Sequence, residues 1–168
     1  GDSRINSDAG NLTLSGTIGG TQALTVGGAG NVTISTTLGI SSLTKDGNGA
    51  LTLSGSISSY TGATTVNAGT LTITNGAYNN NSASSSALTI ASGAAVNVTG
   101  SSGAYSYFGS LAGSGTLVIG NATQSNRFYI GYDNTNTTFS GNISMANSNS
   151  IIYKQGTGTL TLTGDNTG

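Results

Sequence analysis

Cysteine, histidine, tryptophan, proline and glutamate are absent from the 168 residues of this chain, and only 5% of its residues are charged. Without cysteine and histidine the chain cannot form a Ser/His/Asp or Cys/His nucleophile, and the usual zinc ligands are missing. The four basic residues are scattered and the net charge is −1, whereas nucleic-acid binding needs clustered lysine and arginine. No apolar run approaches the length of a membrane-spanning helix. We therefore expect no metal, no cofactor, no nucleic-acid partner and no membrane insertion.

Glycine, serine, threonine and asparagine dominate what is present, with 28 glycines in the chain. Such a composition also occurs in disordered segments. However, 35% of the residues are hydrophobic, and leucine, isoleucine and valine alternate regularly with polar residues. A period of two that is interrupted by glycine and asparagine predicts short strands joined by tight turns.

The strand pattern is clearest over residues 43–73 and recurs at a nearly constant spacing along the chain. The first apolar residue of the equivalent strand is Leu12, Val32, Leu51 and Leu71 in successive units. By subtraction, the gaps between these positions are 20, 19 and 20 residues. A unit of this length that holds two or three short strands predicts one coil of a β-solenoid. Each coil would bury its aliphatic side chains against the coils above and below it.

The expected architecture is all-β, a single parallel β-solenoid domain of about eight coils over residues 1–168. Two interior aliphatic ladders and one outward threonine ladder follow from the alignment. The first interior ladder consists of Leu12, Val32, Leu51 and Leu71, and the second of Leu14, Ile34, Leu53 and Ile73. The outward ladder consists of Thr13, Thr33, Thr52 and Thr72. Later in the chain we align the same strand at Leu117, Phe139 and Leu160. Residues 74–86 have no apolar period and predict a protruding loop.

The opening motif of the clear repeat returns in residues 152–168. Six residues recur 109 positions later, at Lys45/Lys154, Gly47/Gly156, Gly49/Gly158, Leu51/Leu160, Leu53/Leu162 and Gly55/Gly164. The second copy stops halfway through the unit. We expect Lys45 and Lys154 to be exposed turn residues at the same corner of different coils.

The pattern G-x-G-x-L-T-L-S/T-G, followed by Y-T-G-x-T-T-V-N-A-G-T-L, resembles the passenger-associated repeat of bacterial autotransporter proteins. Residues 47–71 match it at nearly every position, residues 156–168 match its first half, and residues 8–15 look like its lead-in. The resemblance implies a right-handed parallel β-helix that is exported to the outer surface of a Gram-negative-type bacterium. Repeat regions of that family typically form a stalk, so we expect an extracellular or cell-surface location.

Any acid–base chemistry would have to come from the five aspartates, because the chain has no other carboxylate side chain. Parallel β-helices that cleave polysaccharides need two or more carboxylates on one face. Asp46 sits in a predicted turn, Asp133 has no evident partner, and the other three lie near the chain ends. We therefore expect no catalytic residues and no enzymatic activity, with polysaccharide cleavage as the weaker alternative.

Aromatic residues concentrate between Tyr105 and Tyr153. Phe108 and Phe128 are separated by the length of one expected coil, so we expect their rings to stack. The interpretation we favour for this cluster is that alternate rings fill a wider part of the solenoid core. The alternative is that tyrosine rings are exposed and contact sugars or a partner surface. The candidate contact residues are then Tyr105, Tyr107, Tyr129 and Tyr132.

Neither end of the predicted solenoid carries a recognisable cap, although a β-helix has open hydrogen-bonding edges at both ends. Two interpretations follow: neighbouring coils of a longer stalk have been cut away, or the partner is another copy of the chain. Copies that stack head to tail give a filament when the contact does not close a ring. The expected function is a structural, non-enzymatic stalk or fibre segment with adhesive contacts. The alternative is a carbohydrate-binding module that uses the tyrosines to hold surface glycans.

Overall fold

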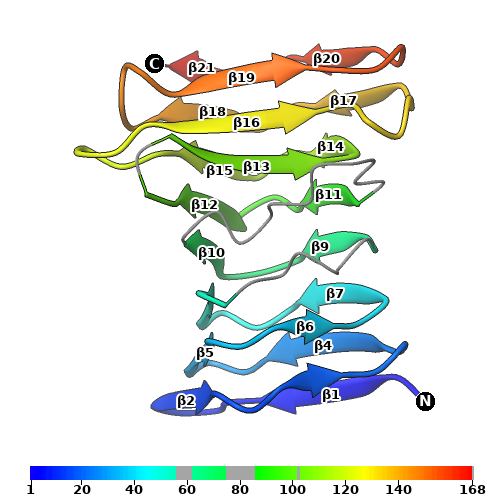
Figure 1. Cartoon of the computed structure of the whole chain (residues 1–168), viewed down its shortest axis with the longest axis vertical. Coiled ribbons are helices and arrows are strands. Elements are labelled where there is room, and N and C mark those ends of the chain that lie inside the picture. Colours follow the sequence, from blue (N-terminus) through cyan, green and yellow to red (C-terminus); the bar gives the residue numbers. More distant parts are fainter. Residues whose placement is uncertain (56–61, 75–85, 102, 168) are drawn as a thin grey trace.

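The structure is a computed structural model, and it describes residues 1–55, 62–74, 86–101 and 103–167. Short strands stack in one column that runs from the N-terminus to the C-terminus (Figure 1). All strand-to-strand pairings between the named strands of the described residues are parallel, and these residues contain no helix. The chain is a β-solenoid, as the alternation and the repeat spacing predicted.

Two eight-stranded sheets run the length of the column. The first sheet consists of β1 (Ser3–Asn6), β4 (Ala23–Gly27), β7 (Ser42–Lys45), β9 (Thr64–Val66), β11 (Ala87–Ile90), β14 (Ser110–Gly113), β17 (Thr137–Phe139) and β20 (Leu160–Leu162). The second sheet consists of β2 (Asn11–Leu14), β5 (Asn31–Ile34), β8 (Ala50–Leu53), β10 (Thr70–Thr74), β12 (Ala95–Thr99), β15 (Thr116–Ile119), β18 (Asn142–Met145) and β21 (Asn166–Thr167). The eight strands in each sheet are joined by about seven turns, close to the predicted eight coils.

The third side of the column differs between its two halves. Near the N-terminus it holds the very short strands β3 (Ile18–Gly19) and β6 (Leu38–Gly39). Near the C-terminus a third sheet is built from β13 (Ala104–Phe108), β16 (Asn126–Ile130) and β19 (Ile151–Lys154). The predicted loop over residues 74–86 falls, apart from its two end residues, outside the described residues.

Coil length varies along the chain, and this corrects one part of the sequence alignment. The step from Leu24 to its partner Leu43 is shorter than the step from Leu117 to its partner Ile143. Phe139 and Leu160 therefore do not continue the ladder of Leu117, because they belong to the first sheet.

The core is the set of side chains that alternate inward from the stacked strands. Both predicted aliphatic ladders and the threonine ladder between them pair in the expected register through the first four coils. Leu51, Leu71 and Leu88 are completely buried, as are the rings of Phe108 and Phe128. Because every coil supplies the same inward positions, the core is one continuous apolar column.

Glycines at the corners allow successive coils to approach at backbone contact. A Cβ atom on Gly49 would lie 1.9 Å from the carbonyl oxygen of Gly30 in the preceding coil. A Cβ atom on Gly113 would likewise lie 2.0 Å from the carbonyl oxygen of Ile90, and Gly113 also has a positive φ of +108°. Any larger residue at these corners would force neighbouring coils apart.

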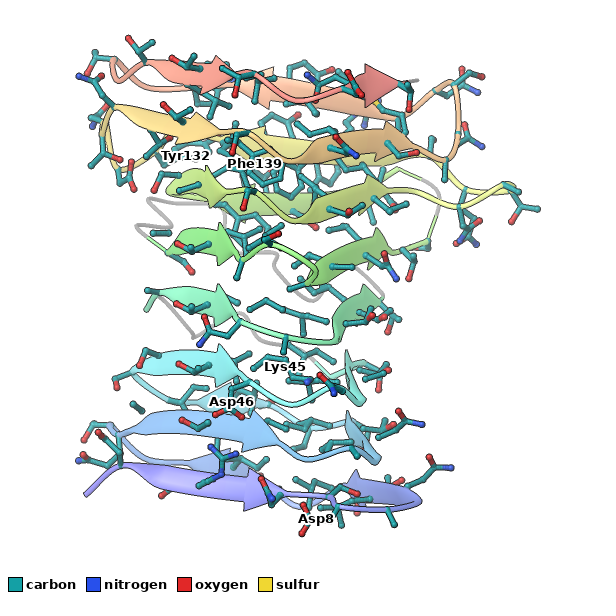
Figure 2. The ribbon with its side chains drawn as sticks, turned by 180° about the vertical axis from the view of Figure 1, so that it is seen from behind. Asp8, Lys45, Asp46, Tyr132 and Phe139 are labelled. Carbon is teal, nitrogen blue, oxygen red and sulfur yellow. The ribbon has the colours of Figure 1, made fainter. Side chains whose placement is uncertain are left out.

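Lys45 occupies an interior position, contrary to the prediction of an exposed turn. It is the last residue of β7 and only 2% exposed, and it stands in the ladder between Val26 and Val66. Its ammonium group donates to the carbonyl oxygen of Gly47 and to that of Ala68, the latter at 3.3 Å. The next coil therefore covers the side chain and also supplies one of its partners. Lys45 is among the residues labelled in Figure 2.

Lys154 ends β19 in the third sheet, so the two lysines are not at the same corner of the solenoid. It pairs in register with the buried Ile130, yet it is exposed. Its ammonium group donates to the carbonyl oxygens of Gln155 and Gly156, both in its own turn. Lys154 is exposed because, in the described residues, no coil lies beyond β19 on this side.

Candidate binding face

The third sheet places its tyrosines on the outer surface and its phenylalanines in the core. Along β13 and β16 the buried inward positions include Ser106, Phe108 and Phe128. Tyr107 and Tyr129 alternate with them and point outward, because successive side chains of a strand face opposite sides of the sheet. The favoured prediction, that alternate aromatic rings fill the core, is confirmed for the phenylalanines and wrong for these tyrosines.

Three tyrosines form a stacked column along the axis of the solenoid. The ring centroids of Tyr107 and Tyr129 are 4.8 Å apart, and those of Tyr129 and Tyr153 are 4.6 Å apart. These distances match the spacing of parallel strands, so consecutive coils place one ring on the next. Tyr132, which follows β16, contacts Tyr107 edge-on at 6.0 Å.

A second outward column runs beside the first and consists of Tyr105, Arg127 and Ile151. Tyr105 and Ile151 are 39% and 40% exposed, which is unusual for large apolar side chains in this molecule. The Arg127 guanidinium donates to the Tyr105 hydroxyl at 2.8 Å, and its central carbon lies 5.3 Å from the centroid of that ring. We call the tyrosines of both columns, together with Arg127, Ile151 and Tyr132, the tyrosine face.

The electrostatics of the tyrosine face combine neutral phenols with one cation. Ring packing desolvates Tyr107 and Tyr129 and raises the pKa of each phenol, and the neighbouring tyrosines act in the same direction. Both hydroxyls therefore remain protonated at neutral pH and can donate or accept hydrogen bonds. Within the described residues, the ion pair of Arg4 with Asp46 is the only one, so Arg127 has no carboxylate partner there.

All four predicted contact residues lie in the tyrosine face, while Arg127, Tyr153 and Ile151 were not among them. Arg127 pairs with Tyr105 in register, and Ile151 pairs with Arg127 in turn. Once the step from β13 to β16 is known, the sequence alone places Arg127 beside Tyr105. The predicted stacking of Phe108 and Phe128 is confirmed, with centroids 5.0 Å apart, although Phe128 stands opposite Ser106 in the register rather than opposite Phe108.

The aspartates considered for catalysis are held in unrelated places. Asp46 accepts two hydrogen bonds from the Arg4 guanidinium, at 2.7 and 3.0 Å, and this interaction is the main reason that its pKa is lowered. Asp133 accepts hydrogen bonds from the backbone and the hydroxyl of Thr135. In Figure 2, Tyr132, the neighbour of Asp133 in the chain, lies several coils from Asp46. In the first sheet, β7, which Asp46 follows, is four strands from β17, which Asp133 precedes. Four strand spacings are about 19 Å, whereas glycoside cleavage needs carboxylates about 5 to 10 Å apart.

In the parts of the chain that the structure describes, no three metal-binding side chains gather in one place. The same residues contain no helix with the length and apolar character that crossing a bilayer requires. Among the residues described, therefore, no catalytic pair of aspartates and no metal-binding cluster is assembled. The tyrosine face is the surface on which a partner would find aromatic rings, hydroxyls and a cation together.

Comparison with protein families gives a match on the same two stretches that the motif analysis singled out. The passenger-associated-transport-repeat family model matches residues 43–73 and 152–168. These two stretches, less than a third of the chain, are similar to the passenger-associated-transport repeat. Neither the curated proteins nor the solved structures give a match.

The two stretches that match the passenger-associated-transport repeat place their equivalent strands in different sheets of the solenoid. The complete copy begins on β7, and its Leu-Thr-Leu run is strand β8 of the second sheet. The partial copy begins on β19, and its Leu-Thr-Leu run is β20 of the first sheet. The repeat therefore specifies a strand–corner–strand unit that can stand on different sides of the column. Together, repeat and solenoid fit a structural segment of the autotransporter-passenger type.

Proposed function

We propose that this chain is a segment of a rigid stalk on the bacterial cell surface, of the autotransporter-passenger type. The observation that carries the proposal is the passenger-associated-transport repeat built into a solenoid whose two long sheets run unbroken through eight strands. Backbone hydrogen bonds between parallel strands run along the column, so bending it would strain whole sheets at once. A stack of eight coils at the usual strand spacing is about 40 Å long.

The composition suits an exported structural role. A chain without cysteine is unaffected by the redox state of its compartment. Its outer faces are covered with threonine and asparagine, which pair between coils; the side chains of Asn11 and Asn31, for example, are hydrogen-bonded at 3.1 Å. Such ladders keep the surface polar with few charges.

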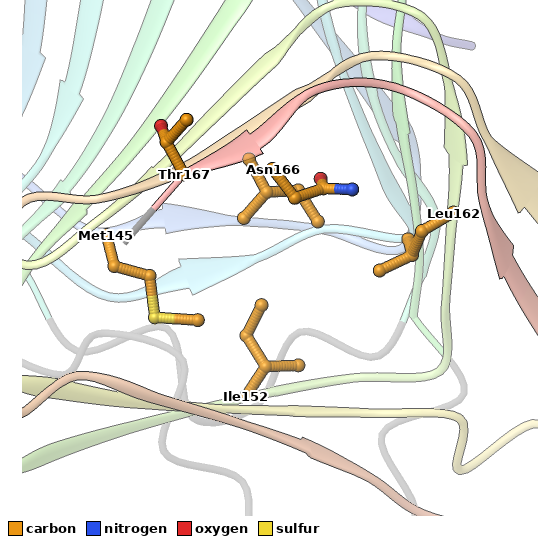
Figure 3. Close-up of a pocket in the computed structure, with 6 residues that line it drawn as sticks. Met145, Ile152, Leu162, Asn166 and Thr167 are labelled. Carbon is orange, nitrogen blue, oxygen red and sulfur yellow. The ribbon is translucent and has the colours of Figure 1, made fainter.

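We further propose that the ends of the solenoid accept more coils, from other copies of the chain stacked head to tail. Apolar side chains that are buried in the middle coils are uncovered at the last one, where Leu162 is 41% exposed. A pocket of about 190 Å³ opens there, and Figure 3 shows Met145, Ile152 and Leu162 around it. At the other end Ile5 and Leu12 are only partly buried, whereas their ladder partners Val26 and Val32 are buried. A coil placed on either end would continue the existing core.

Electron microscopy of the purified chain tests the stacking proposal. We expect fibres of uniform width with an axial repeat near about 40 Å, which shorten on dilution. Leu162→Lys should abolish them, because it places a charge on the uncovered end. Tyr105→Lys is the matched control: it changes a side chain of similar exposure on the side of the column, away from the last coil, and should leave fibres intact.

Isolated rods that remain monomeric on concentration would refute stacking but leave the stalk proposal standing. Export is tested separately, by antibody labelling of intact source cells. Labelling that appears only after the cells are lysed would refute a surface location.

A further inference from the structure

We propose that the tyrosine face binds a glycan that carries a carboxylate, such as an oligosaccharide with a terminal sialic or hexuronic acid. The binding residues are the ladder Tyr107, Tyr129 and Tyr153 together with Tyr105 and Arg127. This inference concerns the side of the column and is independent of whether the ends stack.

The shape of the face limits how a ligand can approach. Within the column of Tyr107, Tyr129 and Tyr153 each ring covers the next, so a sugar cannot insert between them. The ring edges, the hydroxyls and the exposed ring of Tyr105 remain accessible. The two columns span about 10 Å along the axis and stand about 7 Å apart across the strands. This is a flat, shallow surface that suits a short extended oligosaccharide better than a compact ligand.

The chemistry of the face matches the two sides of a sugar ring. Aromatic carbon packs against the C–H groups of a pyranose, and the phenol hydroxyls exchange hydrogen bonds with its hydroxyl groups. The threonine ladder of the second sheet shows that a ladder in this solenoid needs no aromatic residue to pair in register. The tyrosines instead leave apolar ring surface exposed on the outside of the protein.

Charge decides the class of ligand. Arg127 uses one nitrogen for the Tyr105 hydroxyl, and its other N–H groups remain available to a carboxylate, for which a guanidinium is the best-matched cation. No acidic side chain stands in either column, and the carboxylate of Asp133, next to Tyr132 in the chain, accepts hydrogen bonds from Thr135. A single cation is too little for a polyanion such as nucleic acid. A second copy docked face to face would bring two Arg127 side chains together without an acid between them.

The test is titration of the intact chain with sialyllactose and with lactose, followed by tyrosine ring signals in NMR. We expect sialyllactose to bind about tenfold more tightly than lactose, because only it supplies a partner for the guanidinium. Arg127→Gln should remove that preference. Arg4→Gln changes the net charge equally, on β1 at the other end of the column, and should keep it. Tyr129→Phe, which retains the ring and loses the hydroxyl, should weaken both sugars alike.

Thermal melts of the variants establish that each is folded before its binding is measured. Equal binding of the two sugars would overturn the assignment of Arg127, and no binding of either at millimolar concentration would overturn the site. Tighter binding of a short acidic peptide than of sialyllactose would overturn the glycan class. Fibre formation by the same variants reports on stacking separately, so failure of one proposal is not mistaken for failure of the other.

Discussion

Lys45 offers the sharpest test of how this solenoid holds its corners. A lysine in an aliphatic ladder, between Val26 and Val66, is explained by the two carbonyl oxygens that its ammonium group reaches, on Gly47 and Ala68. These oxygens belong to corners of successive coils, so the side chain ties one coil to the next. Replacing Lys45 by methionine keeps a long unbranched side chain and removes both hydrogen bonds.

The expected change follows from opposing effects. Hydrogen bonds from a charged donor contribute about 1.5–3 kcal/mol each, so losing two costs about 3–6 kcal/mol. The methionine side chain recovers about 1–3 kcal/mol through apolar burial, and the buried charge no longer has to be desolvated. We expect Lys45→Met to lower the free energy of unfolding by about 2 kcal/mol, which for a chain of this size lowers Tm by about 4–8 °C.

Urea unfolding followed by circular dichroism measures this difference, with Lys154→Met as the matched control. The same substitution at the exposed lysine should change stability by no more than about 0.5 kcal/mol. A Lys45→Met variant as stable as the parent, or more stable, would refute the reasoning. It would mean that the buried ammonium is a net cost to the fold, as for some buried ion pairs.

The pH dependence of the same pair of proteins gives an independent check. Burial lowers the pKa of Lys45 below its ordinary value of 10.5, with the charge of Asp46 acting in the opposite direction. Between the lowered pKa and 10.5 the unfolded chain binds more protons than the folded one, so the contribution of Lys45 to stability rises with pH. The stability gap between parent and Lys45→Met should therefore widen from neutral pH toward 10.5. A gap that narrows would contradict this sign.

Three further predictions address other parts of the fold. The hydrogen bond from Arg4 lowers the pKa of Asp46, so the stabilisation from this pair is present above the ordinary pKa of 3.8 and is lost as pH falls through the pKa of the folded state. In an acid titration followed by circular dichroism, Asp46→Asn should therefore lose less stability than the parent. Equal losses in the two proteins would count against this prediction. Gly113→Ala should destabilise the fold by about 3 kcal/mol or more, because the added Cβ would meet the carbonyl group of Ile90. Gly93 also has a positive φ but has open space around it, so Gly93→Ala should cost about 1–2 kcal/mol. Similar urea midpoints for the two variants would show that the close approach at Gly113 does not matter. Phe128→Ala should lower the free energy of unfolding by about 3–5 kcal/mol, measured by heat or urea, because the ring is completely buried against Phe108. A decrease below about 1 kcal/mol would mean that the core collapses around the gap.

Sequence reasoning succeeded where coil length is constant. The strands at Leu12, Val32, Leu51 and Leu71 align by simple counting, and their register in the sheet is the one that counting gives. The same counting failed beyond Leu117, because nothing in a local alternation reveals that the next coil is longer. The tyrosine cluster was identified as a candidate contact site, but its orientation was not settled by the sequence.

The run Ala104–Phe108, AYSYF, shows why orientation was ambiguous. Its alternation is compatible with tyrosines inside and serine outside, or the reverse. The register with β16 decides the matter, since Ser106 pairs with the buried Phe128 and Tyr107 with the outward Tyr129. A strand encodes two faces, and only its neighbours determine which of them is the core.

What the sequence determined by itself is therefore local: strands from the period of two, corners from glycine and asparagine, a solenoid from the regular repeat, and the passenger-associated-transport repeat itself. The tertiary structure decided the properties that depend on the coil above and the coil below. Lys45 is buried and Lys154 exposed although they open the same motif, because a coil covers the first and none of the described residues covers the second. Burial in a stack is a property of neighbouring coils, and a motif carries no information about how many neighbours it has.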